Sequence, residues 1–177
     1  MAYSDMLLRP ALPADALAVA RVHVRSWQAA YRGLMPGEYL DQLKPEDRAA
    51  RYDFATRDPE KPQTMLAIEG DQILGFVTTG PSRIAELLDH GEMYALYLDP
   101  EHWGRGIGVS LVEAGRARLK KIGFLKACLW VLEGNVRAER FYVKDGWAPD
   151  GERRKETIWG IEVSDCRYRR ELRVESA

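Results

Sequence analysis

The sequence has 177 residues, with 26 Lys and Arg against 27 Asp and Glu, which gives a formal net charge of −1 at pH 7. A chain of this length suits one domain over residues 1–177 that buries a core without help from disulfide bonds. The balanced charge provides no field that would attract a polyanion, so the composition argues against a nucleic-acid partner.

The cysteines and histidines indicate whether the protein has disulfide bonds or a metal site. Cys128 and Cys166 lie far apart, which favours two reduced cysteines over a bridge. The three histidines lack the spacing of metal ligands, so we expect no metal. No apolar run reaches membrane-spanning length, and the first residues lack the layout of a secretory signal. We therefore expect a cytoplasmic protein with no membrane partner.

The N-terminal half predicts a strand, helices and a hairpin. Residues 6–10 indicate a short strand, and apolar residues at three- and four-residue steps predict a helix over about 13–31. The charged segment 36–57 predicts more helix. Two strand-like runs, 64–69 and 73–78, flank a Gly-Asp-Gln turn, and we expect them to pair as a hairpin.

An apolar strand over 92–98 dominates the C-terminal half. Both of its faces are largely apolar, which is typical of a strand covered by helices on both sides, and this favours an α/β or α+β layered fold. Strict alternation predicts that Glu92, Tyr94, Leu96 and Leu98 share one face. After this strand the sequence predicts, in order, a helix to 122, a strand over 125–132, a helix over 135–146 and strands near 156–159 and 166–172.

A glycine-rich turn joins the central strand to the next helix. Gly104, Gly106 and Gly108 allow the backbone to come close to a ligand, and the first amides of the helix have no acceptor within it. Such a turn suits an anion, most plausibly a phosphate or pyrophosphate. We predict that the backbone amides of this turn hold that group, namely those of Arg105, Gly106, Ile107, Gly108, Val109 and Ser110.

The spacing argues against three common motifs of phosphate binding or nucleophilic catalysis. Val109 and Leu111 stand where a dinucleotide fingerprint would need its third glycine. The sequence has no P-loop motif. The segment around Ser110 also lacks the second glycine of a hydrolase elbow, so this serine is not an obvious nucleophile.

Two motifs together resemble the GCN5-related N-acetyltransferases (GNAT). The first runs from Asp99 to Gly108 as Asp-Pro-Glu-His-Trp-Gly-Arg-Gly-Ile-Gly, and the second covers 135–147. The family's acetyl-CoA signature is Gln or Arg, two residues, Gly, one residue, then Gly or Ala. Here Gly106 and Gly108 take the glycine places, whereas Trp103 replaces the first residue. The resemblance implies an α/β (α+β) fold with a mixed, mostly antiparallel sheet of about six or seven strands, flanked by helices, bulged in its central strand and splayed beside it to admit pantetheine.

The resemblance also implies a donor and its binding residues. The donor is acetyl-CoA, a cosubstrate that would contact Leu96 and Leu98 of the central strand and Asn135. It places Gln28 and Tyr31 at the border of the acceptor pocket. From the residues alone, Asn135 is equally well explained as a helix cap. Packing against the sheet explains Tyr31 as well.

The implied reaction is direct transfer of the acetyl group from the thioester sulfur to an amine. An amine near the lysine pKa of ~10.4 is protonated at neutral pH, so a carboxylate has to take its proton. Glu92, at the start of the central strand, is our candidate base, and a role in solvating the strand end explains it almost as well. Tyr142 stands at the family's general-acid position and would protonate the departing thiolate. Backbone amides of the central strand could polarise the thioester carbonyl.

Other functions stay open. A sensor or regulatory domain that binds acyl-CoA without turnover would keep the same pocket. A nucleotide enzyme would use Glu133 to hold a ribose, but the third glycine of its motif is missing. The sequence does not identify the amine, because antibiotics, polyamines, amino acids, lysine and peptide N-termini all fit. We also hypothesise a homodimer, since Trp159, Ile161 and Tyr168 lie in terminal strands that we expect to form an exposed edge.

Overall fold

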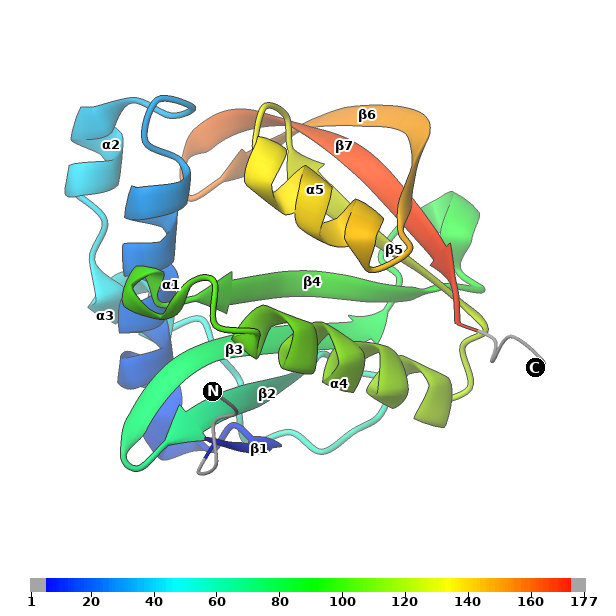
Figure 1. The fold of residues 1–177 in the computed structure, drawn as a ribbon, viewed down its shortest axis with the longest axis horizontal. Coiled ribbons are helices and arrows are strands. Elements are labelled where there is room, and N and C mark those ends of the chain that lie inside the picture. The colour runs from blue at the N-terminus through cyan, green and yellow to red at the C-terminus, as the bar shows by residue number, and fades with distance from the viewer. Residues whose placement is uncertain (1–5, 173–177) are drawn as a thin grey trace.

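A single mixed sheet forms the centre of the computed structural model, which describes residues 6–172 (Figure 1). Its seven strands are β1 (Met6–Pro10), β2 (Gln63–Glu69), β3 (Gln72–Pro81), β4 (Gly91–Leu98), β5 (Lys126–Leu132), β6 (Ala148–Ile158) and β7 (Ile161–Glu171). They lie in the order β1-β2-β3-β4-β5-β7-β6, and only the β4–β5 pair is parallel. The mixed, mostly antiparallel sheet implied by the family resemblance is therefore confirmed.

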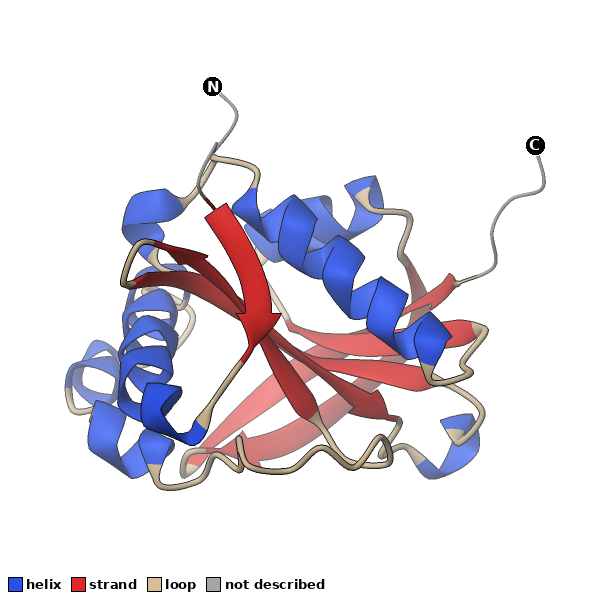
Figure 2. Ribbon diagram, turned by 90° about the horizontal axis from the view of Figure 1, so that it is seen from below, coloured by secondary structure: helices blue, strands red, loops and turns tan. Residues whose placement is uncertain are grey.

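Helices cover both faces of this sheet (Figure 2). Their bounds are α1 (Ala16–Ala30), α2 (Gly37–Asp41), α3 (Pro45–Ala49), α4 (Ile107–Lys121) and α5 (Val136–Lys144). Buried side chains of α1 form apolar clusters on one face, and those of α4 and α5 share a cluster on the other. Helix α4 packs closely on β4 at Gly115, because a Cβ atom at this position would lie only 2.9 Å from Met93 Cε. None of the helices between residues 6 and 172 is both long and apolar enough to cross a membrane.

The sheet opens beside its central strand. β4 and β5 pair only at Gly91–Ala127 and Glu92–Cys128, after which the two strands diverge. This is the splay that the resemblance implied. In Figure 1, α5 and the β6–β7 hairpin lie on one side of the opening, and β4 with the strands before it lies on the other.

A bulge in β4 makes the predicted alternation wrong. Thr78 of β3 pairs with Ala95 but Thr79 pairs with Met93, so Tyr94 is an extra residue in β4. As a result Met93, like Leu96 and Leu98, packs into the cluster of α4 and α5. Ala95 and Tyr97 pack instead beside α1, while Glu92 lines a cavity with residues of α1. Glu92 therefore does not share a face with Leu96 and Leu98.

The segment 36–57 forms less helix than predicted. It contains only the short helices α2 and α3. Pro45 disfavours a helical residue before it, and Lys44 is indeed extended, with φ −112° and ψ 126°. The other predicted helices and the hairpin of β2 and β3 are confirmed.

The three residues named in the dimer hypothesis do not lie on an exposed edge strand. β7 lies between β5 and β6, so that the outer strand is β6. Tyr168 is only 5% exposed, and the Trp159 ring packs on that of Trp27 with centroids 4.5 Å apart. Ile161 joins the apolar cluster around Trp27. The premise is therefore wrong for these three residues, and the homodimer itself stays a hypothesis.

Candidate active site

Two cavities meet where β4 and β5 diverge. The larger, of about 440 Å³, is lined by β4, the glycine-rich turn and α5, and we call it the loop cavity. The smaller, of about 70 Å³, is lined by α1, β4 and the β6–β7 hairpin, and we call it the α1 cavity. Six residues line both cavities, namely Tyr31, Met93, Tyr94, Tyr97, Trp130 and Leu132. The two cavities are therefore adjacent.

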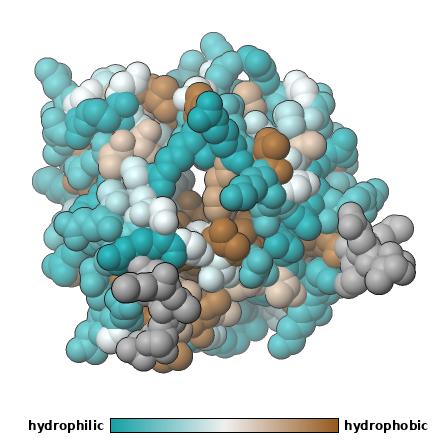
Figure 3. All heavy atoms as spheres, in the orientation of Figure 1, coloured by the Kyte–Doolittle hydropathy of each residue, from teal (hydrophilic) through white to brown (hydrophobic). Residues whose placement is uncertain are grey.

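The surface is hollowed on the face seen in Figure 1. Figure 3 shows a depression near the centre of this face, with hydrophobic atoms in its floor and hydrophilic atoms around its rim. The volume of the loop cavity lies in the range of pockets that bind small organic ligands, roughly 300–1,000 Å³. A ligand with an apolar portion suits a cavity of this size and floor.

The glycine-rich turn forms one end of the loop cavity. Gly104 and Gly106 have φ values of 77° and 82°, a left-handed conformation that glycine adopts without a steric penalty. α4 begins immediately afterwards, so the first amides of the helix lack intrahelical acceptors. The cavity is lined here by Gly106, Ile107, Gly108 and Val109.

Two members of the predicted anion-binding set differ from the others. Neither Arg105 nor Ser110 lines the loop cavity. The Ser110 amide donates to the Gly106 carbonyl at 3.2 Å, as the first hydrogen bond of α4. The Arg105 guanidinium lies 2.9 Å from His102 Nδ1. Their part in anion binding has no support in this geometry.

The start of α5 forms the facing side of the loop cavity. Asn135 Oδ1 accepts a hydrogen bond from the Ala138 amide at 3.3 Å, which makes it the cap of α5, and Asn135 also lines the cavity. The Arg137 guanidinium lies over the Trp103 ring, 3.5 Å from its centroid, and both residues line the cavity. Sequence analysis missed Arg137. A signal was present, because a cation in the first turn of a helix opposes the helix dipole.

Tyr142 lies near the end of α5 and lines the loop cavity. Its side chain is buried between Phe141 and Trp147, with ring centroids 5.2 and 6.1 Å away. Burial raises the pKa of its phenol well above the ordinary value, and the nearby Tyr97 and Asp145 raise it further. Among the residues that the structure describes, none makes a hydrogen bond with this hydroxyl. The Tyr142 hydroxyl is thus protonated and is available to donate a hydrogen bond to a ligand.

Aromatic rings form much of the wall of the α1 cavity. Trp27, Tyr31, Tyr97 and Trp130 all line it. The Tyr31 and Tyr97 hydroxyls lie 3.5 Å apart, and burial raises the pKa of both phenols. These rings offer apolar surface and π faces, which suits a cationic amine with a hydrocarbon portion.

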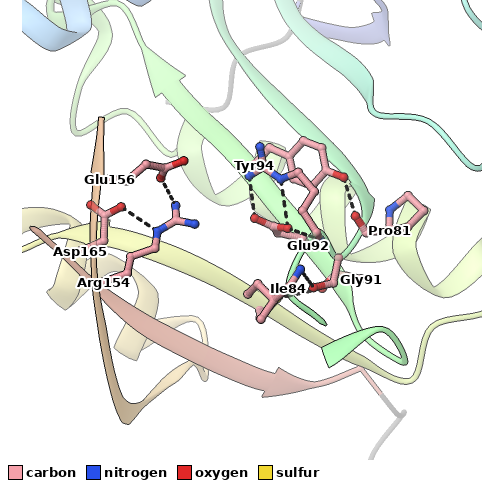
Figure 4. A network of polar contacts seen from close by, with 11 residues as sticks. Pro81, Ile84, Gly91, Glu92, Tyr94, Arg154, Glu156 and Asp165 are labelled. Carbon is pink, nitrogen blue, oxygen red and sulfur yellow. Dashed lines mark hydrogen bonds and ion pairs between the residues drawn. The ribbon is translucent and has the colours of Figure 1, made fainter. Parts of the chain in front are cut away.

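Glu92 lines the α1 cavity as one half of an ion pair with Arg83. It is 1% exposed. The Arg83 backbone amide and Nε donate to its Oε2 at 2.9 and 3.3 Å, and Nη2 donates to its Oε1 at 2.7 Å. Figure 4 shows this network and a second one around Arg154. Both carboxylate oxygens of Glu92 are occupied.

Asp165 of β7 is the second carboxylate of the α1 cavity. It is 5% exposed, and its Oδ2 accepts from Arg154 Nε at 3.2 Å. Burial raises its pKa, and Arg154 works in the opposite direction. Sequence analysis missed Asp165, because only the pairing of Asp165 with Leu132 across β7 and β5 brings it to the cavity.

Of the two residues predicted to border the acceptor pocket, only Tyr31 lines a cavity. Tyr31 lines both cavities. Gln28 lines neither, because its side-chain amide donates to the Leu40 carbonyl at 2.9 Å and ties α1 to α2. Gln28 therefore has a structural role in this geometry and no support as a substrate contact.

Comparisons with known proteins identify the family. The model of the acetyltransferase (GNAT) family matches residues 24–147. The uncharacterized N-acetyltransferase YuaI of Bacillus subtilis is 31% identical over 135 residues, which cover 72% of this chain and 72% of that protein.

Solved structures share the fold at lower identity. The PaiA N-acetyltransferase of Thermoplasma acidophilum, in complex with coenzyme A, has a TM-score of 0.72 and 23% identity, with 94% of this chain and 99% of that chain covered. A GCN5-related N-acetyltransferase of Rhodopseudomonas palustris has a TM-score of 0.74 and 23% identity, with 97% and 98% covered. Since the family model spans more than half of the sequence and a relative is 31% identical over 72% of each chain, the chain belongs to the GNAT family of acetyltransferases.

Proposed function

We propose that this chain transfers the acetyl group of acetyl-CoA directly to an amine bound in the α1 cavity. The observation that carries the proposal is the junction of the two cavities at the gap between β4 and β5. Direct transfer requires the thioester and the amine to meet in contact, and adjacent cavities for the two would bring them together. No covalent acyl-enzyme is needed.

The loop cavity supplies groups for each part of the donor. The amides of Gly106–Val109 at the start of α4 suit the pyrophosphate. Leu96 and Leu98 of β4 line the path from there to the junction and suit the pantetheine arm. Unpaired backbone amides of β4 beside the gap would polarise the thioester carbonyl.

Proton transfers need one acid and one base. Tyr142 would protonate the leaving thiolate, because its phenol is kept in the acid form by burial. The base has to lie in the α1 cavity, where the amine arrives, and Glu92 and Asp165 are the carboxylates there. The acceptor would be a small-molecule or peptide amine. A cytoplasmic location is part of the proposal, and it rests on the unpaired Cys128 and Cys166.

The experiment incubates the protein with acetyl-CoA and a panel of amines, with free thiol as the readout. Spermidine, lysine, a peptide with an N-terminal alanine and an aminoglycoside represent the classes that fit. At least one should release thiol faster than acetyl-CoA hydrolyses. The acyl-CoA sensor is the alternative, and it predicts CoA binding in calorimetry with no amine-dependent thiol release.

A further inference from the structure

The two carboxylates of the α1 cavity differ in how many oxygens they have free. Glu92 uses both of its oxygens on Arg83. These three bonds fill most of the acceptor positions of a carboxylate that is only 1% exposed, so little of Glu92 is left to bind an incoming amine. The geometry suits a group that fixes Arg83, whose guanidinium lies 3.9 Å from the centroid of the Tyr94 ring.

One carboxylate oxygen of Asp165 is available to accept a hydrogen bond from a ligand. Its Oδ2 accepts from Arg154, and no residue within 6–172 donates a hydrogen bond to Oδ1. Figure 4 shows the carboxylate held by Arg154 from one side. Because Asp165 is 5% exposed and lines the α1 cavity, an ammonium group in that cavity could bind Oδ1 without displacing any protein group.

We propose that Asp165 is the base that takes the proton of the acceptor amine, and that Glu92 acts as a positioning residue for Arg83. This inference rests on the proposed acetyl transfer. It names a catalytic residue on β7, a strand that the two sequence motifs do not include.

The proton and bond changes balance with these groups. Asp165 Oδ1 takes one proton from the ammonium ion, which leaves a neutral amine and a neutral carboxylic acid. The nitrogen lone pair forms the N–C bond while the C–S bond breaks. Tyr142 gives its proton to the sulfur and recovers one from the acylated nitrogen through solvent. Asp165 then returns its proton to solvent, so that one proton is released for each acetyl group.

Several elements contribute charges around Asp165. From β6 come Arg154, which lowers its pKa, and Glu156, which raises it. Tyr31, the residue after α1, and Tyr97 of β4 lie within electrostatic reach, and the Glu92–Arg83 pair also lines the cavity. Burial outweighs Arg154, and the net rise brings the pKa closer to neutral pH, where a general base works best.

The first test compares Asp165→Asn with the wild type, using the amine of the panel with the highest turnover. The base is active only when deprotonated, so wild-type kcat/KM should rise with pH through the pKa of Asp165 and then level off. In Asp165→Asn, kcat/KM should fall by about 10²–10⁴-fold at neutral pH. It should then climb about tenfold per pH unit towards the pKa of the amine, because only the free amine reacts. A loss that is equal at every pH would indicate a merely structural role and would overturn the proposal.

The second test keeps both carboxylates and removes the arginine beside each. Arg154→Gln and Arg83→Gln are matched variants. If Asp165 is the base, Arg154→Gln should move the acidic limb of the pH profile to higher pH, since Arg154 lowers the pKa of Asp165. Arg83→Gln should leave the limb in place. The reverse result would assign the base to Glu92, and this pair decides the question even if Asp165→Asn does not fold.

A third measurement does not depend on turnover. In protein labelled with ¹³C at the aspartate carboxyls, the Asp165 signal is identified by its loss in Asp165→Asn or its shift in Arg154→Gln. It should titrate above the ordinary aspartate range. Titration at or below that range would count against Asp165, whereas a raised value together with no turnover of any amine would count against the proposed function alone.

Discussion

Tyr142 brings a buried, protonated hydroxyl to the loop cavity. Tyr142→Phe removes only that hydroxyl, so it should lower kcat by at least about tenfold, within the range of general acid catalysis, and leave the Kd for CoA nearly unchanged. Since burial raises the pKa of the phenol, its deprotonation should not limit activity at neutral pH. Steady-state kinetics and calorimetry measure the two quantities.

Tyr168→Phe is the matched control for this change. Tyr168 is also buried in the cluster of α4 and α5, but it lines neither cavity. Its variant should turn over like the wild type. Full activity of Tyr142→Phe on a good acceptor would show that another group, or water, protonates the thiolate.

Arg137 brings a cation to the wall of the loop cavity. Its guanidinium is stacked on Trp103 at the loop cavity, and Trp103 occupies the place where the family signature has Gln or Arg. We predict that Arg137 supplies from α5 the polar contact that the loop lacks. Hydrogen bonds to charged groups contribute about 1.5–3 kcal/mol, so Arg137→Ala should weaken CoA binding by at least about tenfold in calorimetry.

Arg140→Ala provides the comparison for Arg137. Arg140 is exposed on the same helix and does not line the loop cavity. Its loss should change the Kd very little at physiological salt, because a distant surface charge is largely screened. Equal weakening by both variants would mean that α5 acts only through its general charge.

Which residues could be predicted depends on how local their contacts are. The amides of 106–109 and Asn135 follow from motifs within one turn, and the structure brings them to one cavity. Asp165 reaches its cavity only through the register of β7 on β5, which no local pattern contains. Gln28 shows the opposite case. It lies in the region that the resemblance places beside the acceptor pocket, yet its side chain donates a hydrogen bond to the Leu40 carbonyl.

The element that most affects the site is the bulged strand β4. Period-two alternation predicts faces correctly only for a regular strand, and one inserted residue reverses every assignment beyond it. The family resemblance implied the bulge, whereas the residue pattern alone did not. Its result is that Glu92 lines the α1 cavity while Leu96 and Leu98 pack on the α4 side.

The turn before α4 is the element that should bind the donor's pyrophosphate. Gly106→Glu adds a side chain at φ 82° and a negative charge at the helix start. CoA binding should be lost or greatly weakened in calorimetry. Gly151→Glu is a close control, because Gly151 has φ 88° and a Cβ there would meet no atom within 4 Å, yet it lies in β6 away from the loop cavity.

The control should bind CoA like the wild type despite the same backbone strain. If Gly106→Glu keeps its affinity while circular dichroism shows an intact fold, the pyrophosphate lies elsewhere. Loss of binding in both variants would point to destabilised protein instead, and thermal melts would show it.

At the scale of the whole molecule, the layered fold was predictable and the strand order was not. Apolar runs, glycine turns and helical spacing indicate the elements and their sequence. The arginine-rich β7 looked like an edge strand, yet it is internal, because its charges find partners across the sheet. Arg167, for example, donates from Nε to Asp150 at 2.6 Å, with both side chains largely buried. Such pairing joins residues of β6 and β7 that composition alone treats as surface.

Stability of the whole fold should depend on pH through His23 of α1. This imidazole is 2% exposed, its Nδ1 lies 2.8 Å from the Tyr52 hydroxyl, and its Nε2 has no partner among the described residues. Burial, with a smaller contribution from Arg48, lowers its pKa well below 6.5. The folded state therefore holds a neutral ring at a pH where the unfolded chain binds a proton.

The sign follows from this difference. As pH falls below 6.5, His23 becomes protonated in the unfolded state. In the folded state it stays neutral until the pH reaches its lower pKa. The free energy of unfolding therefore drops by up to about 1.4 kcal/mol per pH unit. His23→Phe keeps an aromatic ring among Tyr97, Phe76 and Trp159, whose centroids lie 4.5, 5.5 and 5.1 Å from that of His23. Urea unfolding between about pH 5 and 7.5 gives the free energy of unfolding at each pH. This free energy should change less steeply with pH in the variant than in the wild type, whatever the absolute stability of the variant. Parallel curves would mean that His23 has the same pKa in the folded and unfolded states. Because Tyr97 packs on His23 and lines both cavities, the same proton should also disturb the wall where donor and acceptor meet.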